Sequence, residues 1–291
     1  MKKTRGRLII EDLELGDSYS LNGINSRIEK HKGCTITYVN IDSEEQARKI
    51  NRDIGKYITI ETDKVHKITD SDFESIVNLT AKVIKNIINV SEQGRILILG
   101  LGNRDITPDS LGPKCIDRII VTRGLEKEMP EIIGYNGFSN VSAISTNVFG
   151  VTGIESAEIA KGIANVLNPQ LIIVIDALST VSLTRLCKTI QISNTALIPG
   201  GGINNSREEI SSENLDVPTI SIGMPTVADT KSILNEAGLS ENSLGDYANS
   251  LIITPSNIDI ATDTAAKLIA FSINKALHYD LSTEEILKFL Y

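Results

Sequence analysis

The sequence predicts an α/β fold, with a mainly parallel, twisted sheet and helices on both faces. Two continuous apolar runs, RILILG at 95–100 and LIIVID at 171–176, are typical of parallel strands that are covered on both sides. Segments with helical periodicity alternate with the strands, as crossover helices do in such a sheet. The length of 291 residues and the hydrophobic content of 41% suit a single α/β domain over residues 1–291, and leave open a smaller N-terminal lobe at about 1–65.

The remaining elements follow from local patterns. Alternation of β-branched and polar residues predicts strands at 34–40 and 57–62, and short apolar segments predict strands at 189–192, 219–223 and 251–254. Apolar residues at three- and four-residue spacing predict an amphipathic helix over 72–90. Three further helices are expected at 113–122 (opened by Pro113), at 153–167 (opened by a capping box of Thr152 and Glu155) and at about 256–278.

Composition and charge exclude several classes of protein. The net charge of −8 disfavours nonspecific nucleic-acid binding and favours a basic polypeptide as partner. No apolar run approaches the roughly 20 residues that span a bilayer. The basic N-terminus lacks the apolar core of a signal peptide, so we expect a cytoplasmic protein. Cys34, Cys115 and Cys187 are widely spaced, which predicts reduced, buried thiols rather than disulfides or a CxxC metal site.

The segment GLGNRDITPDSLGP at 100–113 follows the first central strand and is rich in glycine. Its spacing, with Gly100 and Gly102 followed only by Gly112, does not match the Gly-x-Gly-x-x-Gly of a dinucleotide site. No Walker A motif is present, and PGGGIN at 199–204 lacks the lysine of a phosphate loop, which favours a flexible loop at the sheet edge. We therefore expect no cofactor.

Acidic residues occur where the two central strands end. Asp109 follows the first strand and Asp176 ends the second, and the ends of neighbouring strands lie about 4.8 Å apart. If the strands are neighbours, two partly desolvated carboxyl groups can share one proton, so that one activates a water and the other polarises a carbonyl group. That chemistry suits hydrolysis of an amide bond. Asp105 and Asp229 are further candidates, and the simpler role for any one of these aspartates is a helix cap or a turn.

The residues that other hydrolytic mechanisms require are not found in the segments that build the predicted cleft. His31, His66 and His278 lie outside the segments that build the predicted cleft, which disfavours a Ser-His or Cys-His nucleophile. The chain has no HExxH or comparable histidine pair, so no catalytic metal is expected. The serines and threonines of ALSTVS, after the second central strand, are expected to be caps rather than nucleophiles.

Several long motifs, in order along the chain, resemble the germination protease family of endospore-forming bacteria. The resemblance runs from about residue 34 to the C-terminal SINKALH. The motifs that carry it are GLGNRDITPDSLGPK, GVTGIESAEIAKGI, LIIVIDAL, TIQISNTALIPGGGINN and PTISIGMPTVAD.

The resemblance implies an atypical aspartic endopeptidase with an α/β fold shared with the hydrogenase-maturation proteases. The family's two essential aspartates fall in TPD and IDAL, which here are Asp109 and Asp176. Asn103 and the backbone N–H groups around Gly100–Gly102 are expected to shape the cleft. The implied substrates are small acid-soluble spore proteins in the spore core, the implied assembly is a homo-oligomer, and the family is made as an inactive precursor.

The chain departs from the family pattern at several places. Gly124 stands where the family has histidine, and the segment Ser179–Ser182 replaces one that usually contains arginine. Near the N-terminus Glu11-Asp12-Leu13-Glu14 replaces an R-x-D-L-A processing sequence, which puts self-processing in question. Two alternatives therefore stay open: a metal-dependent maturation peptidase of the hydrogenase type, and a divergent sporulation paralogue that binds without cleaving.

Overall fold

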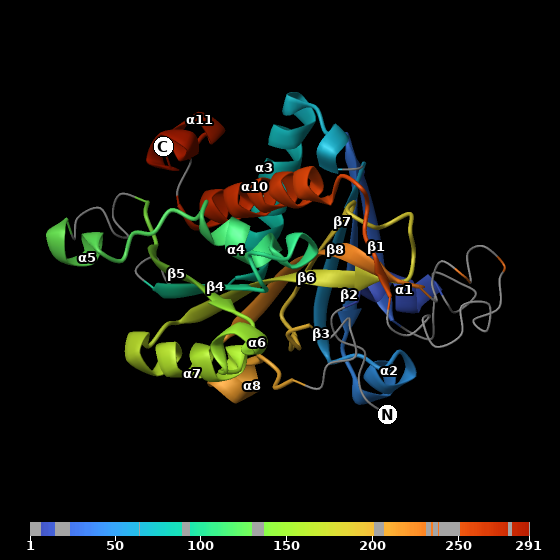
Figure 1. Cartoon of the computed structure of the whole chain (residues 1–291), viewed down its shortest axis with the longest axis horizontal. Helices are drawn as coiled ribbons and strands as arrows, with labels where there is room; N and C mark the ends of the chain where they lie inside the picture. Colours follow the sequence, from blue (N-terminus) through green and yellow to red (C-terminus); the bar gives the residue numbers. More distant parts are fainter. Residues whose placement is uncertain are drawn as a thin grey trace.

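The computed structural model describes most of the chain, and its central feature is one mixed sheet (Figure 1). Within the described residues the sheet has nine strands in the order β1-β2-β3-β7-β8-β6-β4-β5, with β9 paired to β8. The residues described are 7–14, 24–63, 65–88, 94–129, 137–200, 207–230, 234, 238, 251–278 and 281–290.

One half of the sheet is parallel, as predicted for the central strands. It comprises β8 (Thr219–Asp229), β6 (Leu171–Thr180), β4 (Arg95–Leu101) and β5 (Asn140–Asn147). The two apolar runs are direct neighbours, since β4 pairs with β6. The predicted α/β class is confirmed.

An antiparallel half continues the same sheet. It comprises β1 (Asn25–His31), β2 (Cys34–Ile41), β3 (Gly55–Thr62) and β7 (Thr189–Ser193), and β7 joins it to β8. The short β9 (Ile252–Ile253) is also antiparallel to β8. The single domain and the N-terminal lobe stay predictions, although the strands of residues 25–62 belong to this sheet.

Helices cover both faces of the sheet (Figure 1). On one face lie α3 (Asp70–Ile87), α4 (Leu111–Ile116) and α10 (Ile258–Leu277), with α11 (Thr283–Leu290) beyond them. On the other face lie α6 (Phe149–Thr152), α7 (Ser156–Leu167) and α8 (Ser212–Leu215). The smaller elements are α1 (Ile9–Glu14), α2 (Glu44–Lys49), α5 (Leu125–Glu128), η1 (Val65–Lys67) and η2 (Thr107–Asp109).

The two helical layers explain why the central strands are apolar throughout. On β4, Ile96 and Ile98 pack in the core under α3 and α10, whereas Leu97 and Leu99 pack in the core over α7. Successive side chains of a strand point to opposite faces, so a strand covered on both faces is apolar at every position. All three cysteines are buried and free, as predicted. Among the described residues no helix is both long and apolar enough to cross a membrane.

Several predicted boundaries are wrong. The strand through Asp176 continues to Thr180, because β6 and β8 go on pairing with each other beyond the end of β4. Ser179 and Thr180 are therefore strand residues rather than caps. The helix expected at 113–122 is the shorter α4, which begins two residues before Pro113.

The expected capping box is also displaced. Glu155 is itself the N-cap of α7, and its backbone N–H donates a hydrogen bond of 2.9 Å to the Glu158 side chain. Thr152 instead ends the separate short helix α6. A glycine in left-handed conformation, Gly153 at φ 69°, separates the two helices, so Thr152 cannot open the second. The strands β1 and β5 have no counterpart in the sequence prediction; both lie at edges of the sheet, where one side is exposed and the apolar signal is weak.

Candidate active site

Three glycines allow the loop after β4 to fold back tightly against the strand. Gly102 has φ 105°, and a side chain there would collide with the backbone of Asp109. Gly100 and Gly112 pack backbone against backbone, and a Cβ atom at Gly100 would lie 2.5 Å from the Gly112 carbonyl oxygen. The glycines are thus explained by a close approach of two chain segments, with no phosphate needed. The result is a compact turn that carries Asp109.

Asp109 ends the short helix η2, which packs against β6 and β8. Its carboxylate Oδ2 accepts a hydrogen bond of 2.7 Å from the Asn103 N–H, so the backbone at Asn103 does contribute to the site. The backbone N–H of Asp109 donates to the Ile106 carbonyl oxygen at 2.8 Å. Burial raises the pKa of the Asp109 carboxyl, and the hydrogen bond from Asn103 and the positive charge of Arg207 act against that rise.

Asp176 lies within β6, beside Gly223 of β8, and is 4% exposed. Gly223 leaves room for it, because a Cβ atom there would lie 2.6 Å from the Asp176 carbonyl oxygen. The carboxylate accepts hydrogen bonds from the backbone N–H groups of Ala177, at 2.9 Å, and of Gly200. Burial first, and then the negative charge of Asp109, raise the pKa of Asp176 well above its ordinary value.

The structure therefore brings the two predicted acids together. Because β4 ends at Leu101 while β6 continues, Asp176 lies at the step where β4 leaves the sheet, and the loop after β4 returns Asp109 to the same place. The negative charge of Asp109 acts on Asp176, and Asp176 is the more deeply buried of the two. Burial therefore favours the protonated form of both carboxyl groups, and the negative charge of Asp109 favours it further at Asp176.

Arg207 is a residue near the site that no sequence motif predicts. Its positive charge acts on both carboxyl groups and opposes the rise in the pKa of each. Arg207 and Gly200 both belong to the segment between β7 and α8, which contains PGGGIN at 199–204; residues 201–206 of this segment lie outside the described part of the chain. Nothing in the sequence distinguishes this arginine from an ordinary surface arginine, so only its position in the fold reveals it.

The other candidates have different roles. Asp105 is exposed, and its backbone N–H donates to the Asn103 side chain at 2.9 Å, which is a turn contact. Asp229 is the last residue of β8, and its side chain lies outside the described residues. His31 is on β1 beside Glu29, and His278 is buried against the Ile120 carbonyl oxygen. The described side chains contain no group of three or more histidine, cysteine or acidic residues placed to hold a metal ion.

Comparison with known proteins decides the family. The model of the germination protease family matches residues 9–240 of the chain. The chain belongs to the germination protease family. It is 36% identical to a germination protease of Clostridium perfringens strain 13, with 88% of each chain covered. It is 35% identical to that of Caldanaerobacter subterraneus, with 99% of this chain and 98% of the relative covered.

Two further proteins are similar over a smaller part of this chain. The germination protease of Priestia megaterium is 39% identical over 219 residues, which cover 74% of this chain and 59% of that one. Among solved structures, the NiFe hydrogenase maturation protease HycI from Thermococcus kodakarensis is 16% identical, with a TM-score of 0.38, and covers 66% of this chain and 99% of its own.

Two of the three segments that are expected to depart from the germination protease pattern lie in contact. The Glu11 side chain accepts hydrogen bonds from the Thr180 hydroxyl and from the backbone N–H groups of Val181, at 3.1 Å, and Ser182, at 3.4 Å. The end of β6 and the two residues after it thus bind the Glu11 carboxyl group. Gly124, the third departure, is the N-cap of α5 and has no heavy atom within 4 Å of a Cβ built on it.

Proposed function

We propose that this chain is an endopeptidase that initiates degradation of small acid-soluble spore proteins during germination, with Asp109 and Asp176 as its catalytic pair. The proposal places it in the cytoplasm of the spore core and makes it a homo-oligomer. Membership of the germination protease family supports the peptidase activity. The observation that carries the mechanism is the closeness of two carboxyl groups, each held by backbone N–H donors.

The pair supplies both proton transfers of amide hydrolysis. The Asp109 carboxylate takes a proton from a water molecule as the water oxygen attacks the scissile carbonyl carbon. The proton on Asp176 hydrogen-bonds to the carbonyl oxygen and polarises it. The pair then holds two protons and passes one to the amine nitrogen as the C–N bond breaks, so that one proton again remains on the pair. No nucleophilic side chain is required.

The test uses purified small acid-soluble spore protein and the full-length chain, with cleavage followed by gel and mass spectrometry. Asp109→Asn and Asp176→Asn should each reduce kcat by about 10²-fold or more, because each removes a proton-transfer group. Asp105→Asn is the matched control in the same loop, since the Asp105 side chain is exposed, and should cleave normally. Full activity in either of the first two variants would falsify the catalytic assignment.

The same assay distinguishes the two alternatives. Loss of activity in a chelator, with recovery on adding a divalent metal, would point instead to a metal-dependent maturation peptidase. Binding of the spore protein without fragments would point to a paralogue that binds without cleaving. Light scattering coupled to gel filtration tests the homo-oligomer, and a monomeric mass would remove that part of the proposal.

A further inference from the structure

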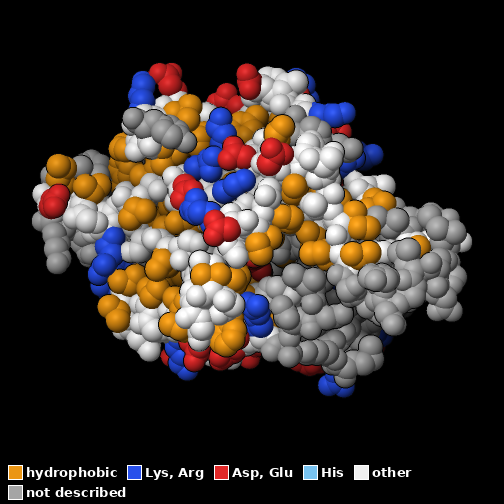
Figure 2. Space-filling model, viewed as in Figure 1, with side chains coloured by type: hydrophobic (Ala, Val, Ile, Leu, Met, Phe, Trp, Pro, Cys, Tyr) orange, Lys and Arg blue, Asp and Glu red, His pale blue; other side chains and the backbone are white. Residues whose placement is uncertain are grey.

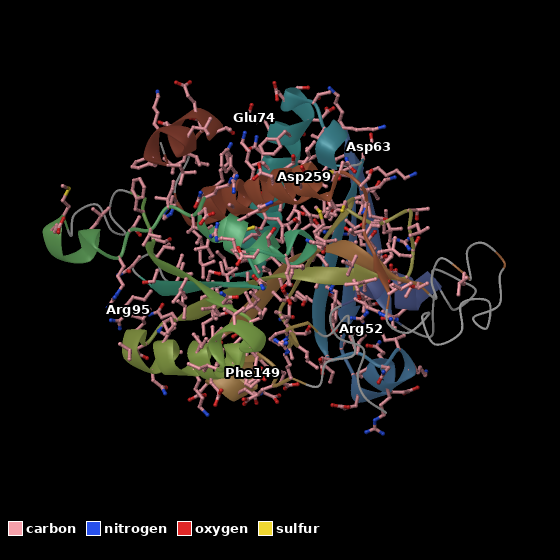
Figure 3. All side chains as sticks on the ribbon, viewed as in Figure 1. Arg52, Asp63, Glu74, Arg95, Phe149 and Asp259 are labelled. Carbon is pink, nitrogen blue, oxygen red and sulfur yellow. The ribbon has the colours of Figure 1, made fainter. Side chains whose placement is uncertain are left out.

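The short helix α6 presents apolar side chains to solvent and buries none of its residues. Phe149 (labelled in Figure 3) and Val151 of α6 are 47% and 60% exposed, and Ile154, just after the helix, is 48% exposed. Single exposed apolar residues are common on protein surfaces, whereas three within six residues form a patch, and such patches mark interaction sites. We call these three residues the α6 patch.

Local hydrogen bonds fix the backbone of this patch. The Gly153 N–H donates to the Phe149 carbonyl oxygen at 2.7 Å and ends the helix in the left-handed conformation. The Ile154 N–H donates to the Thr152 hydroxyl oxygen at 3.1 Å. A patch on such a fixed turn binds a partner with little loss of backbone entropy.

Strand register places the α6 patch near the carboxyl pair. The register between β4 and β6, continued by one residue, brings Leu101 level with Asp176. Leu101 is in turn opposite Asn147, the last residue of β5. Two strand separations of about 4.8 Å put Asn147 about 10 Å from Asp176. Phe149 follows two residues later.

The Asp176 side chain and α6 lie on the same face of the sheet. Val174 and Leu178, two residues before and after Asp176, both pack in the core over α7. Alternate side chains of a strand share a face, so Asp176 points to that face, on which α6 also lies (Figure 1). A polypeptide bound at the carboxyl pair can therefore continue onto the α6 patch without crossing the sheet.

We propose that the α6 patch binds a large apolar side chain of the extended polypeptide substrate, about three to four residues from the bond that is cleaved. That spacing follows because an extended chain spans about 3.3 Å per residue, so about three residues lead from the carboxyl pair to Asn147 and the next reaches Phe149. The inference rests on the proposed function, in which the carboxyl pair cleaves a polypeptide.

Phe149 is expected to contribute most of the binding at this patch. Covering a half-exposed aromatic ring removes a large apolar area from water. The contact lies away from the reacting atoms, so it is made equally before and during the chemical step. Binding of that kind lowers KM and leaves kcat unchanged, a split that a role in catalysis would not give.

The first experiment measures KM and kcat for cleavage of purified small acid-soluble spore protein by the full-length wild type, Phe149→Ala and Phe149→Leu. We expect Phe149→Ala to raise KM about tenfold with kcat within about twofold of wild type, because it removes the contact area of one aromatic side chain. Phe149→Leu should restore most of the affinity. An unchanged KM in a folded Phe149→Ala would overturn the inference.

Val166→Ala is the control for loss of an exposed apolar side chain elsewhere. Val166 is 80% exposed near the end of α7, which leads into the amino end of β6, and its removal should leave both constants unchanged. If Phe149→Ala does not fold, Val151→Ser, at the most exposed position of the patch, takes its place.

The second experiment identifies the substrate side chain. The cleaved bond is mapped by mass spectrometry, and synthetic peptides that span it have the apolar residues at the third and fourth positions on each side replaced in turn by serine. One replacement should raise KM about tenfold with the wild type and hardly at all with Phe149→Ala, where the contact is already lost. Equal effects in the two proteins, or substrates with no apolar residue at these positions, would overturn the inference.

Two further measurements separate this inference from other outcomes. Light scattering tests a second copy of the chain as the occupant: a lower mass for Phe149→Ala with an unchanged KM would assign the patch to contact between copies and overturn the inference. Fluorescence anisotropy measures binding of labelled spore protein without cleavage. A wild type that binds and cleaves nothing would count against the proposed function, and weaker binding by Phe149→Ala would still support the α6 patch. A wild type that neither binds nor cleaves would overturn both.

Discussion

At the scale of single residues, the site depends on glycines at which two backbone segments approach closely. A side chain at these positions would collide with the backbone of the neighbouring segment. Gly102 and Gly223 are glycines because Asp109 and Asp176, respectively, approach them too closely for a Cβ atom. The carboxyl groups are thereby held by backbone geometry: the Asn103 N–H that binds Asp109 belongs to the turn after β4, and the Ala177 N–H that binds Asp176 belongs to β6 itself. The position of each acid is built into main-chain packing.

Gly102→Ala tests this packing. Gly102 has φ 105° and no space for a methyl group, so the variant should lose about 1–3 kcal/mol of unfolding free energy and displace Asp109, with a large fall in kcat. Gly124→Ala is the control, because its backbone is right-handed and its surroundings are open, and it should be close to wild type. Urea denaturation and the cleavage assay measure both, and an alanine at 102 without effect would contradict the packing.

The raised pKa of Asp176 predicts a pH dependence of stability. The folded state holds this proton more tightly than the unfolded chain, whose aspartates titrate near pH 4. The stabilising contribution is therefore complete below about pH 4 and is lost as pH rises toward the folded-state pKa.

Asp176→Asn lacks this titration. Relative to wild type, its unfolding free energy should rise as the pH is raised from about 4 toward neutrality, as measured by urea denaturation at a series of pH values. A difference between the two proteins that stays constant with pH would show that Asp176 titrates as an ordinary exposed carboxyl.

At the scale of elements, the N-terminal helix α1 joins the two halves of the sheet. Glu11 of α1 binds the end of β6. The buried Arg52 (labelled in Figure 3) pairs with Asp12 and donates to the carbonyl oxygens of Arg7, at 3.1 Å, and Leu8, at 3.0 Å. The helix α1 is thus a packed part of the fold.

Glu11→Ala should show how much this contact contributes. It removes the acceptor of two backbone N–H groups and a hydroxyl in a buried place, which costs about 1–3 kcal/mol of unfolding free energy. Glu44→Ala, at an exposed position on α2, removes the same group without such contacts and should leave the urea midpoint unchanged. Equal midpoints for the two variants would mean that α1 is not held through Glu11.

At the scale of the whole molecule, the sheet changes from parallel to antiparallel at β8, and the carboxyl pair lies at the step where β4 ends beside the longer β6. Acidic and basic side chains are interspersed over α4 and α10 on the face in Figure 2. Two ion pairs there are Arg104 with Asp117 and Arg118 with Asp263. The net charge of −8 is therefore not gathered into one acidic patch on that face.

This architecture predicts a gradient of local stability. Backbone amides of β6 and β8, which lie in the middle of the sheet with buried side chains, should exchange with deuterium most slowly. Those of the edge strand β1, most of whose residues are exposed, should exchange much faster. Hydrogen exchange followed by mass spectrometry measures both, and equal protection of β1 and β6 would argue that another chain covers the β1 edge.

The sequence by itself determined the α/β class, the central strands and the two acids worth testing. Each depends on local information: a continuous apolar run, a glycine beside a turn, a carboxylate next to a strand. Tertiary structure alone decided that β6 runs past Asp176, that β1 and β5 complete the sheet, and that the positive charge of Arg207 acts on both carboxyl groups. These features depend on which distant segments pair and in what register. The charged groups that come close to a residue in the folded chain are distant in sequence, so local patterns do not predict them.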